Sequence, residues 1–433
     1  QPKTYVSVLS HVKVELPEQA MRYTSMPNAE KGEGIWAASG VNEANVAKTA
    51  TETITTNPRV QGADPLVVYQ PAKDGQEEVL GGIGEEDIVC LVLPYIKSAR
   101  EGVARLGQLL ETYGTYENNG IAFQDADEIW WLETIGGHHW MARRVPDDVY
   151  VVMPNQLGID TFDLEDALGE QKEYMCSPDL KEFIEKYHLD LSMDSVLNPR
   201  DAFGSHDDSD HVYNTARAWY MLRTLNPRTK VWDGPNAEYT PFSDDLPWCM
   251  VPEKKITVED VKYVLSSHYQ GTPYDPYASY GDKTMCGAYR SIGINRNDVM
   301  TLIQMRPEGE PIQWLAFASN AFNVLVPFYA TIDTTPDYFS STTREVTTDS
   351  FYWVSRMIGA MADASYKSSI FHIERYQERV MSKGHQLIGK YDALLEKESD
   401  AAKRMSLRHQ ANQEIADMVK KEVDPAAVTA SQV

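Results

Sequence analysis

The sequence predicts an α+β protein in which antiparallel sheets are stacked and helices lie outside them. Short runs rich in β-branched and aromatic residues follow one another in the first 160 residues, and the chain is helical from about residue 350. Strands and helices occur in blocks without regular β-α-β alternation, which argues against a doubly wound parallel sheet. The 433 residues, 42% of them hydrophobic, suffice for one large domain or two ordinary ones.

Residues 1–60 are predicted to form strands. Side chains alternate over residues 5–16 in the pattern of a half-buried strand, which places on one side Val6, Val8, Val12 and Val14.

Residues 34–57 predict a β-hairpin. One apolar run ends at Gly40, Asn42 and Glu43 form the turn, and a second run carries small residues at Ala47, Ala50 and Thr51. Because small side chains let a ligand or another backbone approach closely, this hairpin is the first candidate site.

Proline, glycine and capping residues mark the boundaries of the elements that follow. A helix is predicted from near Glu85, with Pro94 kinking or splitting it and Gly114 ending it. Short strands are predicted at residues 120–123, 128–134, 139–144, 150–153, 290–294, 299–305 and 314–318. Helices are predicted near residues 178–187, at 256–268 with Thr257 as N-cap, and from about residue 350 into the charged segment 391–423.

Composition excludes several classes of function. The formal net charge of −24 argues against nucleic acid and against an anionic membrane surface as partners. The longest apolar run, residues 88–96, is too short to span a bilayer. The four cysteines form no CxxC pair, so a reduced compartment, the cytoplasm, is expected. We expect no cofactor; export stays open because Gln1 does not look like a native start.

The second informative stretch is residues 128–160, EIWWLETIGGHHWMARRVPDDVYVVMPNQLGID. It predicts a meander whose last strand leads to Asn155, in the turn Pro154-Asn155-Gln156. A side-chain amide held at a strand end is a donor that a tetrahedral oxyanion needs, and one such donor is typically worth about 10²–10³ in rate. The alternative is that Asn155 only forms the turn.

Together the two stretches resemble a known family. GVNEANVAKTATETITTN (40–57) resembles the GxNExG-type hairpin of the N-terminal-nucleophile (Ntn) hydrolases related to penicillin V acylase and bile salt hydrolase. Residues 128–160 resemble more closely one branch of that family, the cysteine dipeptidases. The same resemblance continues through the tracts at 198–221, 264–277, 289–297 and 334–339.

The resemblance implies a four-layer αββα sandwich over residues 1–350, lacking its first strand, and a helical C-terminal region over residues 351–433. Family enzymes use the thiolate of a leading cysteine as nucleophile and its free amine as general base. By position, Asn155 is the oxyanion-hole side chain. Arg290 supports the charge of the nucleophile, with Arg296 as the less favoured candidate and a buried ion pair as the alternative for Arg290.

The hairpin is the implied second half of the site. The backbone or a side chain of Thr51, Glu52 and Thr53 is expected to provide a second oxyanion donor and to bind the substrate main chain. Glu52 is also a candidate for the substrate's ammonium group, with a structural ion pair as its alternative.

The chain departs from the family at its beginning. Gln1 has no nucleophilic side chain, and none of the four cysteines carries a free α-amine. We therefore expect the nucleophile to lie upstream of Gln1, and the 433 residues alone to lack peptidase activity.

Two histidine-rich sequences, His138-His139 and SHDDSDH (205–211), bring together imidazoles and carboxylates, which are zinc and calcium ligands. No HExxH motif occurs and SHDDSDH lacks the EF-hand pattern, so a metal is the less favoured interpretation. We expect His206 and Asp207 instead to recognise the substrate's ammonium group or to close the site; a plain solvated loop fits equally well.

The leading hypothesis is a dipeptidase acting on small peptide substrates. The alternatives are an amidase of the same fold acting on penicillin V or conjugated bile salts, a metallopeptidase, and a non-catalytic protein. The charged segment 391–423 is expected to be a solvated helix face, with a homo-oligomer as its alternative.

Overall fold

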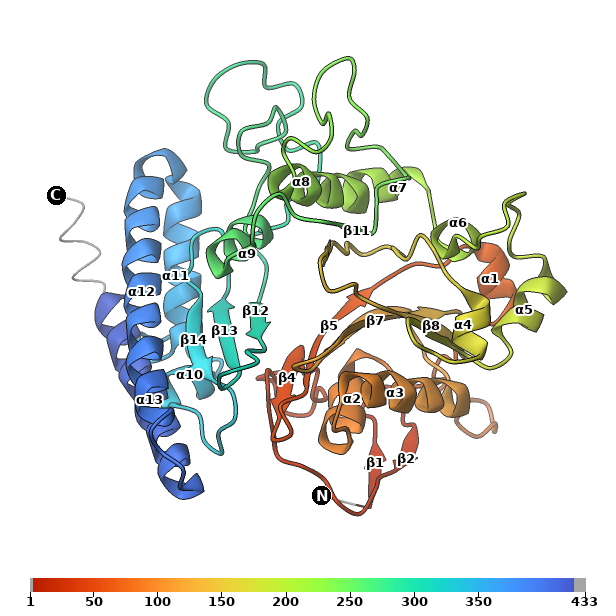
Figure 1. Ribbon diagram of the computed structural model, residues 1–433, viewed down its shortest axis with the longest axis horizontal. Helices are drawn as coiled ribbons and strands as arrows, with labels where there is room; N and C mark the ends of the chain where they lie inside the picture. Colours follow the sequence, from red (N-terminus) through yellow and green to blue (C-terminus); the bar gives the residue numbers. More distant parts are fainter. Residues whose placement is uncertain (1–2, 424–433) are drawn as a thin grey trace. The chain divides into compact units, whose positions relative to one another are not determined.

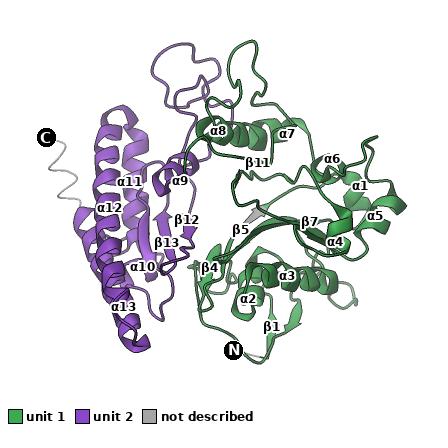
Figure 2. Cartoon of the chain, viewed as in Figure 1, with its two compact units in different colours: residues 1–255 green, residues 256–433 purple. Residues whose placement is uncertain are grey.

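A seven-stranded antiparallel sheet is the centre of the first part of the computed structural model, which describes residues 3–423 except for the side chains of residues 50–52. The chain divides into two compact units, Gln1–Lys255 and Ile256–Val433 (Figure 2). In the described residues no helix is both long and apolar enough to cross a membrane. The predicted mixture of helices with antiparallel sheets is confirmed.

The large sheet has the strand order β10-β8-β7-β6-β5-β4-β3, with every neighbouring pair antiparallel. Its strands are β3 (Tyr23–Ser25), β4 (Ser39–Asn42), β5 (Ala47–Thr53), β6 (Asn119–Gln124), β7 (Ile129–Ile135), β8 (His139–Arg144) and β10 (Tyr174–Cys176). The predicted strands at 120–123, 128–134 and 139–144 are therefore confirmed, and β3 lies within the N-terminal stretch predicted to form strands, whereas the edge strand β10 was not predicted.

Two helices cover one face of this sheet, α2 (Glu85–Val92) and α3 (Ala99–Tyr113), as Figure 1 shows. Pro94 lies in a short 3₁₀ helix, η1 (Leu93–Tyr95), which separates them, and Gly114 ends α3 at φ +68°. The break at Pro94 and the helix end at Gly114 were both predicted. The helices bury leucines and valines against the sheet residues Ile121, Phe123, Trp130, Leu132 and Trp140.

A second core lies on the opposite face. The sheet contributes Trp131, Ile135 and Met141, which alternate with the residues of the first core as a two-sided sheet requires. Loops and short helices cover them: α1 (Pro58–Ala63), α4 (Leu164–Leu168), α5 (Leu180–Tyr187) and α6 (Pro199–Phe203). The remaining elements of this unit are the pairs β1 (Thr4–Val6) with β2 (Lys13–Glu15) and β9 (Tyr150–Val151) with β11 (Cys249–Met250), and α7 (Asp208–Asp210), the π-helix η2 (His211–Thr215) and α8 (Ala216–Leu225).

The predicted hairpin at residues 34–57 is confirmed as β4 and β5. Asn42, expected in the turn, ends β4 and organises the turn from there. Its Oδ1 accepts hydrogen bonds from the backbone N–H groups of Ala44 and Val46, both at 3.0 Å. Its Nδ2 donates to the carbonyls of Leu93 (2.9 Å) and Ile96 (2.8 Å), which ties the hairpin to the segment between α2 and α3.

Two strand predictions are wrong, and a third is confirmed in part. Residues 5–16 form two strands instead of one, and Val6 and Val8 are exposed. The strand is interrupted because the backbone N–H groups of Val8 and Leu9 donate to the Glu86 carboxylate instead of to a neighbouring strand. The strand predicted at 150–153 is present at residues 150–151 as β9, which pairs with β11 and lies outside the large sheet. Residues 290–294 are a loop.

The second unit is built on a three-stranded antiparallel sheet, β12 (Val299–Gln304), β13 (Ile312–Phe317) and β14 (Val326–Tyr329). Its helices are α9 (Val258–Leu265), α10 (Asp337–Ser340), α11 (Phe351–Ala364), α12 (Tyr366–Leu395) and α13 (Ala401–Glu422). Thr257 caps α9, as predicted, in a capping box with Asp260.

The C-terminal helices pack on this small sheet. The Asn412 amide accepts from the N–H of Tyr329 at 2.9 Å and donates to its carbonyl at 3.0 Å. Arg306 makes a bidentate pair with Asp392 at 2.6 and 3.0 Å. The helical segment expected from about residue 350 is thus present; the division into domains 1–350 and 351–433 stays a prediction.

Candidate functional site

Residues 154–160 form a loop that follows β9 and is anchored to the large sheet at Gly158. Glu133 of β7 accepts from the Gly158 N–H through Oε1 at 2.7 Å, and the same oxygen accepts from Trp131 Nε1 at 3.0 Å. Arg200 Nη2 donates to the Gly158 carbonyl at 2.7 Å. The N–H and the carbonyl of Gly158 are therefore both hydrogen-bonded, which anchors the loop at this residue.

Glu133 is fully buried, and its Oε2 has no hydrogen-bond partner among the described residues. Burial raises its pKa to about 7, although the hydrogen bonds from Gly158 and Trp131 and the charge of Arg200 act in the opposite direction. The carboxyl therefore changes its charge near neutral pH, and it is hydrogen-bonded to Gly158 of the loop that carries Asn155.

Asn155 is half-buried, and its side-chain amide is oriented by an arginine. Arg217 Nη2 donates to Asn155 Oδ1 at 2.7 Å. A guanidinium has only donors, so the oxygen of the amide faces Arg217 and its NH₂ faces the opposite way.

The same arginine is bound to its own helical turn. Its Nη2 also donates to Asn214 Oδ1 at 2.7 Å, and its Nε donates to the Tyr213 carbonyl at 2.6 Å. Asn214 Nδ2 in turn donates to Asp210 Oδ1 at 2.6 Å. Sequence reasoning missed Arg217; the available signal was its three-residue spacing from Asn214, which puts both side chains on one helix face.

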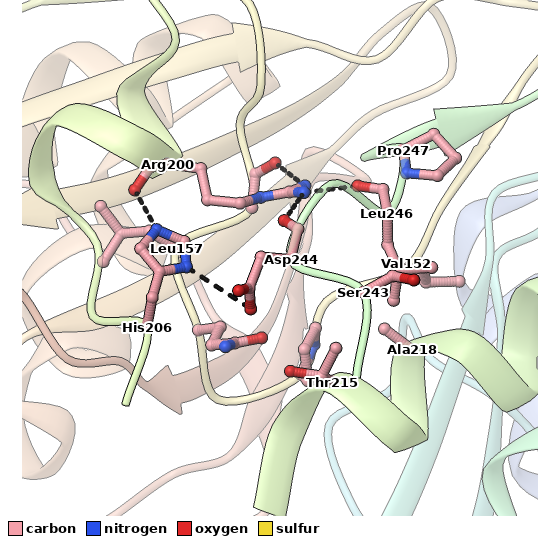
Figure 3. A pocket seen from close by; sticks show the side chains of 13 residues that line it. Val152, Leu157, Arg200, His206, Thr215, Ala218, Ser243, Asp244, Leu246 and Pro247 are labelled. Carbon is pink, nitrogen blue, oxygen red and sulfur yellow. Dashed lines mark hydrogen bonds and ion pairs between the residues drawn. The ribbon is translucent and has the colours of Figure 1, made fainter. Parts of the chain in front are cut away.

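His206 and Asp207 lie in this same segment, but each has a local partner. His206 Nε2 donates to the Arg200 carbonyl at 3.1 Å, and its Nδ1 is 3.8 Å from Asp244 Oδ1 (Figure 3). The Asp207 carboxylate caps α7 by accepting from Ser209 and Asp210. These hydrogen bonds lower the pKa of Asp207, and the one from the Ser209 hydroxyl has the largest effect.

The cavity drawn in Figure 3 lies behind the loop, lined by Pro154, Leu157, Arg200, His206 and Asp244 among others. Its volume of about 20 Å³ is enough for about one water molecule. A dipeptide does not fit there. Arg200 crosses this space and donates to the carbonyls of Asp244 (3.1 Å) and Leu246 (2.5 Å), so the cavity belongs to the support of the loop.

The end of the hairpin meets the segment that carries His206. Thr56 forms an antiparallel bridge with Gly204, and the Ser205 N–H donates to the Thr55 carbonyl at 3.3 Å. The register of β5 against β6 shifts between Thr49 and Glu52, as a β-bulge does beside many active sites. The structure thus brings the end of the hairpin and the segment of His206 together.

The side chains of Thr51 and Glu52 lie outside the described residues, so their predicted roles in substrate binding stay predictions. Thr53 is exposed, and its hydroxyl lies 3.5 Å from Glu85 Oε1, which is a weak contact. Arg290 is half-buried in a loop of the second unit, where its carbonyl accepts from the Tyr269 hydroxyl at 2.8 Å. Because Arg290 and Arg296 belong to the second unit, their roles beside Asn155 also stay predictions.

Cys90, Cys176 and Cys249 do not have the surroundings of an activated nucleophile. Burial raises the pKa of the thiols of Cys90 and Cys249, and that of Cys176 to about 12. A thiol with a raised pKa is a poor source of thiolate at neutral pH. Cys286 is half-buried in the second unit.

His138 and His139 are both held by one carboxylate. His138 Nδ1 lies 3.0 Å from Asp64 Oδ1, and His139 Nδ1 lies 2.7 Å from Asp64 Oδ2. Among residues 3–49 and 53–423, no group of three or more His, Cys, Asp or Glu side chains is arranged to hold a metal ion.

Comparison with known proteins places the chain among the peptidases. The pattern of "Peptidase family C69" matches residues 1–379. A "Dipeptidase" of Bifidobacterium longum (strain NCC 2705) is 56% identical over 432 residues, covering 98% of this chain and 81% of that protein. "Probable dipeptidase A" of Streptococcus pyogenes serotype M3 (strain SSI-1) is 53% identical over 400 residues, 91% of this chain and 81% of that protein. "Dipeptidase A" of Lactobacillus helveticus is 40% identical over 439 residues, 100% of this chain and 84% of that protein.

The chain belongs to peptidase family C69. The sequence resemblance to dipeptidases is therefore confirmed.

Proposed function

We propose that this protein is a dipeptidase that uses an N-terminal cysteine as its nucleophile, with that cysteine upstream of Gln1. The proposal takes its activity from the names of dipeptidases that are 40–56% identical to this chain over most of its length. The observation that carries it is the orientation of Asn155, whose Oδ1 is held by Arg217 at 2.7 Å so that its NH₂ is presented as a donor. The proposed fold remains the four-layer αββα sandwich of the Ntn hydrolases.

The chemistry follows from these groups. The free α-amine of the leading cysteine takes the thiol proton, and the thiolate attacks the carbonyl carbon of the peptide bond. The oxyanion that forms accepts from Asn155 Nδ2 and from a donor of residues 51–53. The amine then gives its proton to the leaving amino group, and water hydrolyses the thioester. In this scheme Arg290 stabilises the charge of the nucleophile.

Substrate recognition is proposed to come from the hairpin and the segment after it. Glu52 remains the candidate for the substrate's ammonium group. His206 remains a candidate for closing the site, because its segment adjoins the end of the hairpin. Asp207 is expected to contribute less to substrate recognition, because its carboxylate already caps α7.

The surroundings of the internal cysteines support a nucleophile elsewhere. Cys90, Cys176 and Cys249 have thiols whose pKa is raised by burial, whereas a nucleophilic cysteine needs a lowered one. We therefore propose that the 433 residues alone are inactive and that the complete gene product hydrolyses dipeptides without a cofactor.

The first test compares the complete gene product with the 433-residue chain on a panel of dipeptides, with penicillin V as the control amide. The gene product should hydrolyse dipeptides and lose this activity on alkylation of its leading thiol, and the short chain should be inactive. Dipeptide hydrolysis by the short chain at the rate of the gene product would refute the upstream nucleophile.

The second test is Asn155→Ala in the complete gene product. It should lower kcat by about 10²–10³ while KM and the melting temperature change little, because the amide acts only on the transition state. An unchanged kcat would refute the oxyanion assignment.

A further inference from the structure

A chain of hydrogen-bonded polar side chains runs from the segment SHDDSDH (205–211) to Asn155. Ser205 Oγ donates to Asp210 Oδ2 at 2.7 Å, and Asn214 Nδ2 donates to Asp210 Oδ1 at 2.6 Å. Asn214 Oδ1 then accepts from Arg217 Nη2, which also donates to Asn155 Oδ1, both at 2.7 Å. Asp210, Asn214 and Arg217 are at most 9% exposed.

The direction of every amide in this chain is determined by its neighbours. A carboxylate only accepts and a guanidinium only donates, so Asn214 must turn its NH₂ toward Asp210 and its oxygen toward Arg217. The same reasoning turns the oxygen of Asn155 toward Arg217. A rotation of either amide by 180° would set donor against donor, at a cost of the order of a buried unsatisfied hydrogen bond, about 1–3 kcal/mol.

The backbone of this segment places the side chains. Asp210 ends α7, and residues His211–Thr215 form the π-helix that leads into α8. Wide helical turns of this kind are frequent at functional sites, because they re-aim side chains relative to an α-helix. Here Tyr213 also supplies a carbonyl to Arg217 Nε at 2.6 Å and a ring 5.1 Å from its guanidinium carbon.

We infer that Arg217 is a positioning residue for the oxyanion-binding amide of Asn155, and that Asn214 and Asp210 set its position in turn. The inference rests on the proposed function, since it gives Arg217 an effect on turnover only through Asn155. Arg217 keeps the amide NH₂ aimed at the developing oxyanion before substrate arrives. Such preorganisation matters because a misplacement of about 1 Å can cost about 10²-fold in rate.

The main experiment is a double-mutant cycle in the complete gene product, with Asn155→Ala and Arg217→Met as the single variants. Methionine keeps much of the length of the side chain and removes every donor. Arg217→Met alone should lower kcat by about 10- to 100-fold with KM changed less than about threefold. In the Asn155→Ala background it should lower kcat no further, because the group through which it acts is already gone.

Two matched variants complete the design. Arg223→Met, on the same helix, removes the contact of Arg223 with Asp233 and should leave kcat unchanged. Arg217→Lys keeps the positive charge and one flexible donor, and should recover part of the turnover lost in Arg217→Met. Should Arg217→Met fail to fold, Arg217→Lys takes its place in the cycle, with a smaller loss of kcat that again disappears in the Asn155→Ala background.

The outcomes separate this inference from the proposed function. If Asn155→Ala leaves kcat unchanged, the oxyanion assignment fails and the positioning role fails with it. If Asn155→Ala lowers kcat but the Arg217 variant has the same effect with and without Asn155, the proposed function stands and the positioning role is overturned. A rise in KM at constant kcat would likewise overturn it, because it would make Arg217 a ground-state binding residue.

Discussion

The carboxylate of Glu133 binds the backbone N–H of Gly158 at 2.7 Å, from a position in the large sheet that is completely buried. This contact couples the protonation of one strand residue to the loop that carries Asn155. Burial raises the pKa of the Glu133 carboxyl from an ordinary value of 4.5 to about 7. The carboxyl therefore binds its proton more tightly in the folded chain than in the unfolded one.

Glu133→Gln should therefore change how stability depends on pH. The folded state binds the extra proton between about pH 4.5 and 7, so the contribution of Glu133 to stability falls as pH rises through that window. Glutamine keeps an acceptor for Gly158 and cannot ionise. The free energy of unfolding of the variant, relative to that of the parent, should increase by up to roughly 3 kcal/mol from pH 5 to pH 8. Urea unfolding at the two pH values measures this difference. A gain that is the same at both pH values would contradict the raised pKa.

Asp64→Asn should destabilise the first unit at neutral pH. Burial acts to raise the pKa of Asp64, but hydrogen bonds from His139, His138 and their backbone N–H groups lower it to about 2. A carboxyl with a lowered pKa contributes stability above its ordinary pKa near 4, and the contribution is lost as pH falls toward 2. The loss in the variant should be about 2 kcal/mol at pH 7 and should vanish near pH 2.

The control for this experiment is Asp179→Asn. Asp179 also contacts His139, at 3.4 Å, but its side chain is 69% exposed, so its removal should cost little. If both variants lose the same stability, the effect does not come from the burial and hydrogen bonding of Asp64.

Lys48→Met should stabilise the 433-residue chain. Lys48 lies in β5 and is 0% exposed, and its Nζ has no hydrogen-bond partner among the described residues. Burial lowers its pKa to about 7, although Glu85 and Cys90 act in the opposite direction. The unfolded chain therefore binds more protons between about pH 7 and 10.5, and the parent gains stability as pH rises through that window.

Methionine fills the same space without a charge, so the gain of Lys48→Met should be a few kcal/mol at pH 7, up to about 4, and should shrink toward pH 10.5. Thermal unfolding at pH 7 and pH 9.5 measures it, with the exposed Lys31→Met as the control. A destabilised Lys48→Met chain at pH 7 would show that the amine is stabilised by a counter-charge.

Asn42→Ala should destabilise the hairpin strongly. The substitution leaves the Leu93 and Ile96 carbonyls and the Ala44 and Val46 N–H groups without the amide that now satisfies them. Buried groups that lose their partner cost about 1–3 kcal/mol each, and partial relaxation should bring the total to roughly 3 kcal/mol. Asn45→Ala, in the same turn but exposed, is the comparison; equal losses would mean that the turn itself, and not the link to residues 93–96, is responsible.

Much of the fold could be predicted because its signals are local. Pro94 and Gly114 mark the breaks of the helical segment, Thr257 and Asp260 form the box that starts α9, and the hairpin of β4 and β5 follows from its small and β-branched residues. The predictions failed where the partner of a strand lies far along the chain. Residues 150–153 look like a strand of the meander, but β10 takes the place beside β8, because its residues Met175 and Cys176 are buried against the cores of the sheet.

The candidate site shows the same division. The sequence by itself determined that Asn155 stands in a rigid Pro-Asn-Gln turn, that the hairpin carries small residues, and that the chain resembles dipeptidases. Each of these features depends only on residues that are neighbours in the sequence. Only the tertiary structure decided that Arg217 holds the Asn155 amide and that Glu133 holds Gly158. Those partners are 62 and 25 residues apart, and no local pattern specifies which of many buried donors and acceptors will meet when the loop packs on the sheet.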